Sequence, residues 1–374
     1  MSQLGLPEEI IFPRSPVHYS TINMEPPQPH KPKSSLLEDI FGAVDSATAK
    51  ASCIQTGYYD DQLLLRFIEQ VEPRPRLINR GYFARVFTIL KCIASFCKSV
   101  QGEKQVVMLG AGFDSYFLTI KNDLPGLILW VDIDLPEVVE AKQRIYSQKL
   151  TPEQRAIHQI VTGDLLSIPS IHESLRKAKL NPRIPTIFVL ECVTAYIPPE
   201  NVRSLLKYIA QPSEFASIIK QEDGSAESLQ FPLIRGPVQV IGYDPMSNET
   251  DNFGRVMIQN LKRRGIEMPS LMAFPSCDAR KSALRDSGFI NAVAYDMNKA
   301  YQNIPQAERK RIEKIEPLDE FEEFHLLLSH YCAWQGTSQL LEEIGLLDDN
   351  APLSTIGPQV QPSRPKQHGP TFFI

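Results

Sequence analysis

The sequence predicts a doubly wound α/β fold, and three short apolar runs are the main observations behind this prediction. Residues 105–109, 127–134 and 186–191 are apolar without alternation, which is typical of parallel strands buried on both faces. Stretches with helical spacing separate these runs, so strand and helix alternate along the chain. In such a sheet, ligands bind outside the carboxyl ends of the strands, near the point where the strand order reverses. We therefore look for the functional site there.

The predicted helices are recognised by apolar residues that recur every three or four positions. A long helix opens at Asn79 and continues to about Ala94. Prolines stand at the entrance of another helix, over 199–210, where their fixed φ suits the first turn. Further helices are expected over 35–48, 60–70 and 135–148.

Two proline-rich segments flank this alternating region. Residues 1–34 and 350–374 show no sustained periodicity, which is typical of disordered chain. We therefore expect a disordered N-terminal arm, a catalytic domain over 35–349 and a disordered C-terminal tail.

The composition is that of an ordinary globular protein, with 43% hydrophobic and 22% charged residues. A net charge of −5 lacks the basic excess of a broad nucleic-acid-binding surface, and no run approaches the ~18 apolar residues that span a membrane. The six cysteines form no CxxC pair, so neither a metal site nor a disulfide framework is expected. We expect a cytoplasmic monomer, with the nucleus as a second compartment, that binds no nucleic acid and no membrane.

A glycine turn, Gly110-Ala111-Gly112, follows the first buried run. Glycine lets the backbone turn sharply after a strand and lets a ligand approach where a β-carbon would clash. Taken alone, the motif describes a bare strand-to-helix turn equally well. A dinucleotide fingerprint would need a third glycine, where this chain has Ser115. Gly110 and Gly112 are therefore expected to cradle a nucleoside without a pyrophosphate, such as S-adenosylmethionine.

Acidic residues follow the buried runs at the spacing of a nucleoside site. Asp132 and Asp134 are expected to face opposite ways. Asp134, beside the next loop, is expected to accept from ribose hydroxyls, and Asp132 to be structural. Asp164, with Leu165, is expected to meet the adenine ring, although an acid here can also cap a helix. Glu191 ends a buried run, where a carboxylate needs a partner such as the methionine ammonium group.

With these residues in view, the sequence resembles the leucine carboxyl methyltransferases, which methylate the C-terminal leucine of the protein phosphatase 2A catalytic subunit. The resemblance runs from about residue 50 to about residue 334. Its most specific blocks are INRGYFAR at 78–85, LGAG at 109–112, ECV at 191–193, DNFG at 251–254 with MIQNL at 257–261, and HYC at 330–332.

The resemblance implies a Rossmann-like class I methyltransferase fold with extra helices that form a substrate lid. It also implies that the phosphatase subunit is bound through its C-terminal tail and its active-site face. Arg85 and Lys50 would lie near carboxylates of the cofactor or the peptide, and Tyr196 would line the acceptor channel. Without the family, Arg85 would be interpreted as part of a surface ion pair and Tyr196 as a core aromatic. The implied cofactor contacts are Lys50, Arg85, Gly110, Asp134, Asp164, Leu165 and Glu191.

The implied reaction is methyl esterification of an α-carboxylate. A C-terminal carboxyl group has a pKa of about 3.3–3.7, so it is already a nucleophilic anion at pH 7. The task that remains is alignment with water excluded. Arg85 would hold one carboxylate oxygen while the other attacks, with Tyr196 as a second positioning residue, and we expect no general base.

One segment departs from the family pattern. A predicted strand over 215–219 would lead almost directly to the block at Tyr243, but residues 220–242 intervene, and we interpret them as an inserted loop.

Three alternative functions are less consistent with the sequence. A relative that methyl-esterifies a carboxylate on a hypermodified tRNA base carries a C-terminal kelch propeller, and repeats of about 50 residues are not seen in this sequence. A non-catalytic phosphatase-binding relative is favoured by the insertion but disfavoured by four intact site residues, Gly110, Asp134, Asp164 and Glu191. Ser115 disfavours a nicotinamide dehydrogenase.

Overall fold

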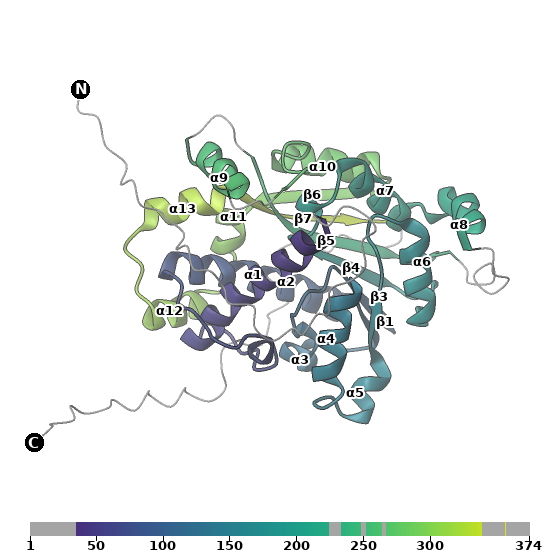
Figure 1. The fold of residues 1–374 in the computed structure, drawn as a ribbon, viewed down its shortest axis with the longest axis horizontal. Helices are drawn as coiled ribbons and strands as arrows, with labels where there is room; N and C mark the ends of the chain where they lie inside the picture. Colours follow the sequence, from purple (N-terminus) through teal and green to yellow (C-terminus); the bar gives the residue numbers. More distant parts are fainter. Residues whose placement is uncertain (1–34, 224–232, 248–251, 264–266, 339–355, 357–374) are drawn as a thin grey trace, which may run out of the picture.

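A computed structural model describes residues 35–223, 233–247, 252–263, 267–338 and residue 356. Within these residues, seven strands form one sheet in the order β3-β2-β1-β4-β5-β7-β6 (Figure 1). Neighbouring strands from β3 to β5 are parallel, whereas β7 is antiparallel to both β5 and β6. The strands are β1 (Lys104–Leu109), β2 (Leu127–Asp134), β3 (His158–Thr162), β4 (Thr186–Glu191), β5 (Val238–Pro245), β6 (Asn291–Asp296) and β7 (Tyr331–Thr337).

Helices cover both faces of this sheet, which confirms the doubly wound prediction. One hydrophobic cluster joins the sheet to α1, α2, α11, α12 and α13, and the other joins it to α6, α7 and α10. The helices are α1 (Ser35–Thr56), α2 (Arg76–Ser99), α3 (Tyr116–Thr119), α4 (Pro136–Tyr146), α5 (Pro152–Ile157), α6 (Ile168–Lys177), α7 (Pro199–Ala210), α8 (Ala216–Asp223), α9 (Asn252–Arg263), α10 (Cys277–Asp286), α11 (Met297–Gln302), α12 (Gln306–Ile315) and α13 (Phe321–Ser329), with 3-10 turns η1 (Leu64–Phe67), η2 (Lys121–Asp123), η3 (Thr194–Tyr196) and η4 (Pro212–Phe215).

Strand β1 shows why the central runs do not alternate. All six of its residues are buried. Val106 and Met108 belong to the cluster with α1 and α2, whereas Val107 and Leu109 belong to the cluster on the opposite face. Because both faces of the strand are covered, both sets of side chains are apolar.

Most predicted elements agree closely with the structure. The predicted strands over 127–134 and 186–191 and the helix over 199–210 coincide with β2, β4 and α7. The predicted helix over 60–70 is wrong, because only the short turn η1 forms there. The carboxylate of Asp61 accepts the backbone N–H of Leu64 at 2.9 Å, and such a local side-chain bond competes with a continuous helix.

The segment around 215–242 also differs from the prediction. Residues 215–219 belong to η4 and α8 instead of a strand, because a short apolar run alone does not distinguish a buried strand from a helix. The interpretation of 220–242 as one inserted loop is wrong as well. Its first residues continue α8, and residues 238–242 belong to β5, which lies between β4 and β7. Residues 224–232 lie outside the described residues, as do the predicted arm over 1–34 and, except for Ile356, the predicted tail over 350–374.

The strand order fixes where a ligand can bind. From β1 the chain moves outward through β2 and β3, and then returns to place β4 on the other side of β1. The order therefore reverses between β1 and β4, and ligands bind at the carboxyl ends of such strands. Gly110 follows the end of β1, and Glu191 is the last residue of β4.

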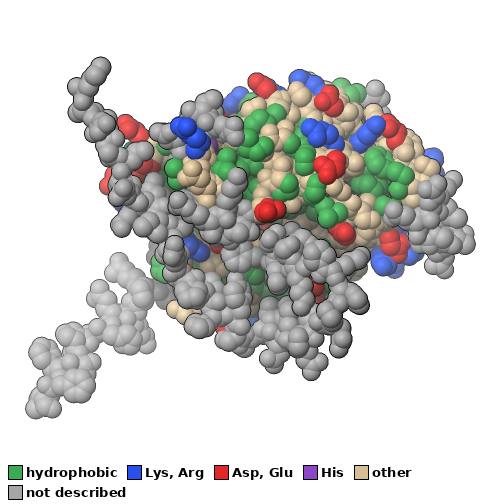
Figure 2. All heavy atoms as spheres, turned by 45° about the horizontal axis from the view of Figure 1, so that its top comes forward, with side chains coloured by type: hydrophobic (Ala, Val, Ile, Leu, Met, Phe, Trp, Pro, Cys, Tyr) green, Lys and Arg blue, Asp and Glu red, His purple; other side chains and the backbone are tan. Residues whose placement is uncertain are grey.

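The surface mixes charges of both signs on the face that Figure 2 displays, with hydrophobic side chains between them. No helix in the described part of the chain is long and apolar enough to cross a membrane.

The centre of β5 offers a test of this packing. A Cβ on Gly242 would lie closer than 3.0 Å to ring atoms of the buried Trp334. We expect Gly242→Ala to destabilise the fold by about 3 kcal/mol, because the buried indole ring of Trp334, on the neighbouring strand, cannot move aside. A fall of several degrees in the melting temperature would show this effect.

Gly81→Ala is the matched control. Gly81 lies within α2, and its Cβ would make an ordinary contact with Leu327 at 3.5 Å. Alanine there should stabilise the helix by about 0.5–1 kcal/mol. Equal melting temperatures for the two variants would contradict the packing argument.

Candidate functional site

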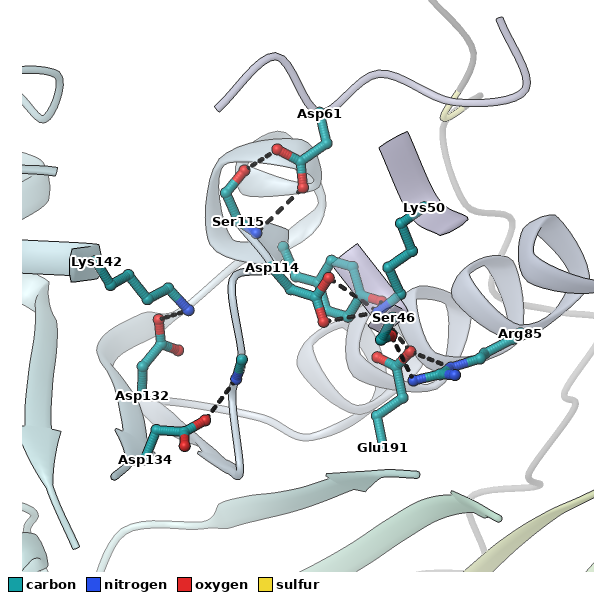
Figure 3. A network of polar contacts seen from close by, with 12 residues as sticks. Ser46, Lys50, Asp61, Arg85, Asp114, Ser115, Asp132, Asp134, Lys142 and Glu191 are labelled. Atoms are coloured by element: carbon teal, nitrogen blue, oxygen red, sulfur yellow. Dashed lines mark hydrogen bonds and ion pairs between the residues drawn. The ribbon is translucent and has the colours of Figure 1, made fainter. Parts of the chain in front are cut away.

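Four charged side chains meet at the switch point of the sheet (Figure 3). Lys50 Nζ donates to Glu191 Oε1 at 2.7 Å and to the two carboxylate oxygens of Asp114 at 2.9 and 2.7 Å. Arg85 Nε donates to the same Glu191 oxygen at 2.5 Å. The hydroxyl of Tyr116 accepts a further bond from Lys50 at 2.8 Å. Two cations and two carboxylates thus form one connected network.

Each charge reaches the network from a different element. Lys50 comes from α1, Arg85 from the middle of α2 and Glu191 from the end of β4. Asp114 follows the glycine turn after one intervening residue, Phe113. The exposed fractions of the Lys50, Arg85 and Glu191 side chains are 1%, 8% and 3%, so the network is removed from solvent. Buried charges are tolerated when they are paired and hydrogen-bonded, as these are.

The shared cations act unequally on the two carboxylates. Burial alone would raise the pKa of Glu191, but the charges of Lys50 and Arg85 outweigh it and lower the pKa to about 2. Burial raises the pKa of Asp114 to about 6. The positive charge of Lys50 opposes this rise, whereas the negative charge of Glu191 adds to it. Glu191 is therefore the firmly ionised member, and Asp114 gains a proton first as the pH falls.

One carboxylate oxygen of this network has no hydrogen-bond partner among the described residues. Glu191 Oε1 receives both cations, whereas Oε2 is buried without a hydrogen bond from any described residue. A buried carboxylate oxygen without a donor is unfavourable. The donor set of an ammonium group suits this position, so the site fits the methionine end of S-adenosylmethionine.

Glycine is required at the two positions of the turn for different structural reasons. Both have positive φ, 72° at Gly110 and 50° at Gly112. A Cβ on Gly110 would overlap the side chain of Val193, so packing against the loop after β4 excludes a larger residue there. A Cβ on Gly112 would meet nothing within 4 Å. Only Gly112 therefore borders open space in which a ligand can lie.

The prediction that the two aspartates of β2 face opposite ways is wrong, because residues two apart on a strand lie on the same face. Asp132 is buried and pairs with Lys142 at 2.8 Å and His158 at 2.9 Å, so it is structural. Asp134 accepts the backbone N–H of Gly112 at 2.6 Å, which ties it to the glycine turn. Its carboxylate thus lies beside the open space at Gly112.

Asp164 lies in an exposed turn after β3, and Leu165 follows it. The carboxylate accepts the backbone N–H of Leu166 at 2.8 Å. The alternative that Asp164 caps the next helix is wrong, because Ser167 is the N-cap of α6.

Arg85 is enclosed by aromatic rings. Its guanidinium lies 5.4 Å from the ring centre of Tyr82 and 5.1 Å from that of Tyr243, which stacks on Tyr331. Tyr196 lies on η3 near Gly42 of α1. Burial raises the pKa of its hydroxyl, and the positive charge of Arg85 opposes this rise. The alternative that Arg85 forms a surface ion pair is wrong, since its guanidinium is buried.

Sequence reasoning missed Asp114 as a member of the network. The available signal was a charged residue two positions after the glycine turn, with aromatic residues on both sides. Ser115 was considered only as a missing glycine, yet its hydroxyl and its backbone N–H both donate to the buried Asp61. This contact holds the glycine loop against the segment before η1.

The INRGYFAR block combines two tasks. Asn79 and Arg80 hold α2 to α12, since Asn79 donates to Glu316 at 3.1 Å and Arg80 to Glu313 at 2.6 Å. Arg85 at the end of the block points into the charge network instead. The block is therefore partly a structural clamp and partly a site element.

Comparisons with known proteins identify the family of this chain. A family model described as "Leucine carboxyl methyltransferase" matches residues 28–210. "Leucine carboxyl methyltransferase 1" of Bos taurus is 31% identical, covering 80% of this chain and 91% of that protein. The Arabidopsis thaliana "Leucine carboxyl methyltransferase 1 homolog" is 28% identical over 80% of this chain and 89% of its own length.

A second kind of relative matches over a smaller share of its length. The Homo sapiens "tRNA wybutosine-synthesizing protein 4" is 28% identical, covering 76% of this chain but 42% of that protein. The stronger full-length similarity is to the leucine carboxyl methyltransferases. The chain therefore belongs to the leucine carboxyl methyltransferase family and is an S-adenosylmethionine-dependent carboxyl methyltransferase.

Proposed function

We propose that this enzyme methyl-esterifies the C-terminal leucine α-carboxylate of the protein phosphatase 2A catalytic subunit. The observation that carries the proposal is the buried guanidinium of Arg85, held between Glu191 and aromatic rings at the switch point of the sheet. A desolvated cation next to a cofactor site suits a carboxylate acceptor. Membership of the leucine carboxyl methyltransferase family supports this acceptor class.

The cofactor residues follow from the geometry of the switch point. Glu191 Oε2 would accept the ammonium group, because it is the buried oxygen without a donor. Gly112 would lie under the ligand, and Asp134 beside it would accept from the ribose hydroxyls. Asp164 and Leu165, after β3, would border the adenine ring, with Gly110 shaping the turn. S-adenosylmethionine supplies an activated methyl group when bound.

Arg85 has two roles in this proposal. Its Nε is held by Glu191, which orients the guanidinium, and Nη2 lies 3.4 Å from Ser46 Oγ. The Nη groups are the part of the fork that would hold an acceptor carboxylate. Lys50 already contacts two carboxylates of the protein, so its main role would be to balance their charge.

The remaining work of the site is to position groups and exclude water. The rings of Tyr82 and Tyr243 cover the guanidinium, and Tyr196 would line the acceptor channel beside it. A leucine carboxylate is ionised at neutral pH and needs no base to activate it. The site would act by holding the carboxylate in line with the methyl group.

The test uses labelled S-adenosylmethionine and the phosphatase catalytic subunit, with and without its terminal leucine. Base-labile label is expected only when the leucine is present, because a methyl ester is hydrolysed by alkali. Equal labelling of the truncated subunit would contradict the acceptor assignment. Label transferred to tRNA instead would favour the wybutosine-type activity.

Glu191→Gln tests the proposed ammonium partner. The amide keeps the size of the side chain but loses the charge, so we expect S-adenosylmethionine to bind at least about tenfold more weakly. Calorimetric titration measures this loss. Glu200→Gln, at an exposed position on α7, is the control and should bind as the wild type does. Unchanged affinity in Glu191→Gln would refute the assignment.

The raised pKa of Asp114 predicts a pH dependence of stability. The folded-state pKa of about 6 exceeds the ordinary value of 3.8, so the folded protein binds this proton more tightly than the unfolded chain. The contribution of Asp114 is therefore most favourable at low pH and is lost as the pH rises through 6. Glu191, with a lowered pKa, adds the opposite trend only below about pH 4.5.

Asp114→Asn isolates this effect. We expect the wild type to gain stability relative to Asp114→Asn as the pH falls from 7.5 to 5, because only the wild type takes up the proton. Melting curves of both proteins across this range measure the difference. A difference that stays constant with pH would show that the Asp114 carboxyl is not perturbed.

A further inference from the structure

We propose that Arg280 and Asp244 are positioning residues for methyl transfer, which act by holding the loop from Cys192 to Tyr196. This loop joins Glu191 to Tyr196, so the inference rests on the roles proposed above for these two residues. Arg280 lies on α10 and Asp244 on β5, on the side of the loop away from Arg85. Neither residue touches the charge network described above.

The loop connects three parts of the site within a few residues. Cys192 has a φ of 58°, a left-handed conformation that a residue other than glycine rarely adopts. Val193 packs over Gly110 of the glycine turn. The turn η3 then places Tyr196 near Gly42 of α1. An unfavourable backbone conformation persists only where surrounding contacts hold it.

A buried polar cluster supplies those contacts. Arg280 Nη1 donates to Thr194 Oγ1 at 2.8 Å, and its Nη2 lies 3.6 Å from Asp244 Oδ2. The Asp244 carboxylate accepts the backbone N–H of Ala195 at 3.3 Å and the indole N–H of Trp334 at 2.8 Å. Arg280 and Asp244 are 2% and 0% exposed.

The hydrogen bonding of Arg280 points to a positioning role. Its Nε and Nη2 are buried without hydrogen-bond partners among the described residues, so its one hydrogen bond there goes to the loop. Its guanidinium lies 4.5 Å from the ring centre of Phe274 and 5.8 Å from that of Trp334. An apolar side chain would fill this space, but it would leave the buried carboxylate of Asp244 without its cation. What such a side chain cannot do is hold the Thr194 hydroxyl.

Strand β5 links the cluster to the charge network. Tyr243 and Asp244 are consecutive, so their side chains lie on opposite faces of the sheet. Tyr243 lies against Arg85, and its carbonyl accepts the backbone N–H of Cys192 at 2.6 Å. Asp244 holds Ala195 from the other face. Movement of Asp244 or Arg280 would therefore shift Tyr196 relative to the guanidinium of Arg85.

Thr194→Val is the sharpest test, because it keeps the shape of the side chain and removes the hydroxyl that Arg280 binds. We expect the variant to stay folded and to lose about tenfold in kcat/KM for the phosphatase subunit, mostly in kcat. Arg280→Met should lose at least as much, and Arg280→Lys should recover part of the loss. Arg285→Met, at an exposed position on the same helix, is the matched control and should match the wild type.

Two outcomes would separate the possible failures. Wild-type turnover in Thr194→Val and Arg280→Lys, together with a lower melting temperature in Arg280→Met, would show that Arg280 only stabilises the fold and would overturn the inference. If the wild type does not methylate the phosphatase subunit, the acceptor assignment fails, and the inference is read from cofactor affinity instead. Calorimetry should then show S-adenosylmethionine binding several-fold more weakly to Thr194→Val, because Glu191 begins the same loop, and equal affinity would overturn the inference.

Discussion

Glu191 ends a central strand with two cations on one oxygen, and the arrangement of the surrounding elements depends on this contact. Lys50 and Arg85 come from separate helices and lie 141 and 106 residues away from it in sequence. None of the three charges can be buried without the others, because a single unpaired charge in this position would destabilise the fold by about 3–5 kcal/mol. Helices α1 and α2 therefore have to pack over the carboxyl end of β4 for the site to exist.

Contacts within the protein hold the charged groups of the site in place. One oxygen of Glu191 accepts hydrogen bonds from both cations, and the other has no donor among the described residues. Arg85 is held through Nε, and its Nη2 lies 3.4 Å from Ser46 Oγ. Groups held in this way need little rearrangement when a ligand binds. Aromatic rings around the guanidinium keep the local polarity low, which strengthens the attraction of a carboxylate.

Local patterns predicted the parts of the molecule whose environment is uniform. Strands β2 and β4 are apolar throughout because both faces of the sheet are covered, so their limits could be read from the sequence. The site residues Asp134 and Glu191 could be found because they end such strands. Strand β5 was missed because Gln239 and Gly242 interrupt its apolar pattern, and the glycine is explained only by its contact with Trp334. Asp114 was missed because its partner Lys50 is 64 residues away in sequence, so no local pattern connects the two.

The contact between Gly110 and Val193 has a consequence for how this site can evolve. The two residues share one small volume, between the turn that follows β1 and the loop that follows β4. A side chain at one position leaves no room for the present side chain at the other. Among homologous sequences the two positions should therefore vary as a pair, and their combined side-chain volume should be conserved more strictly than either residue.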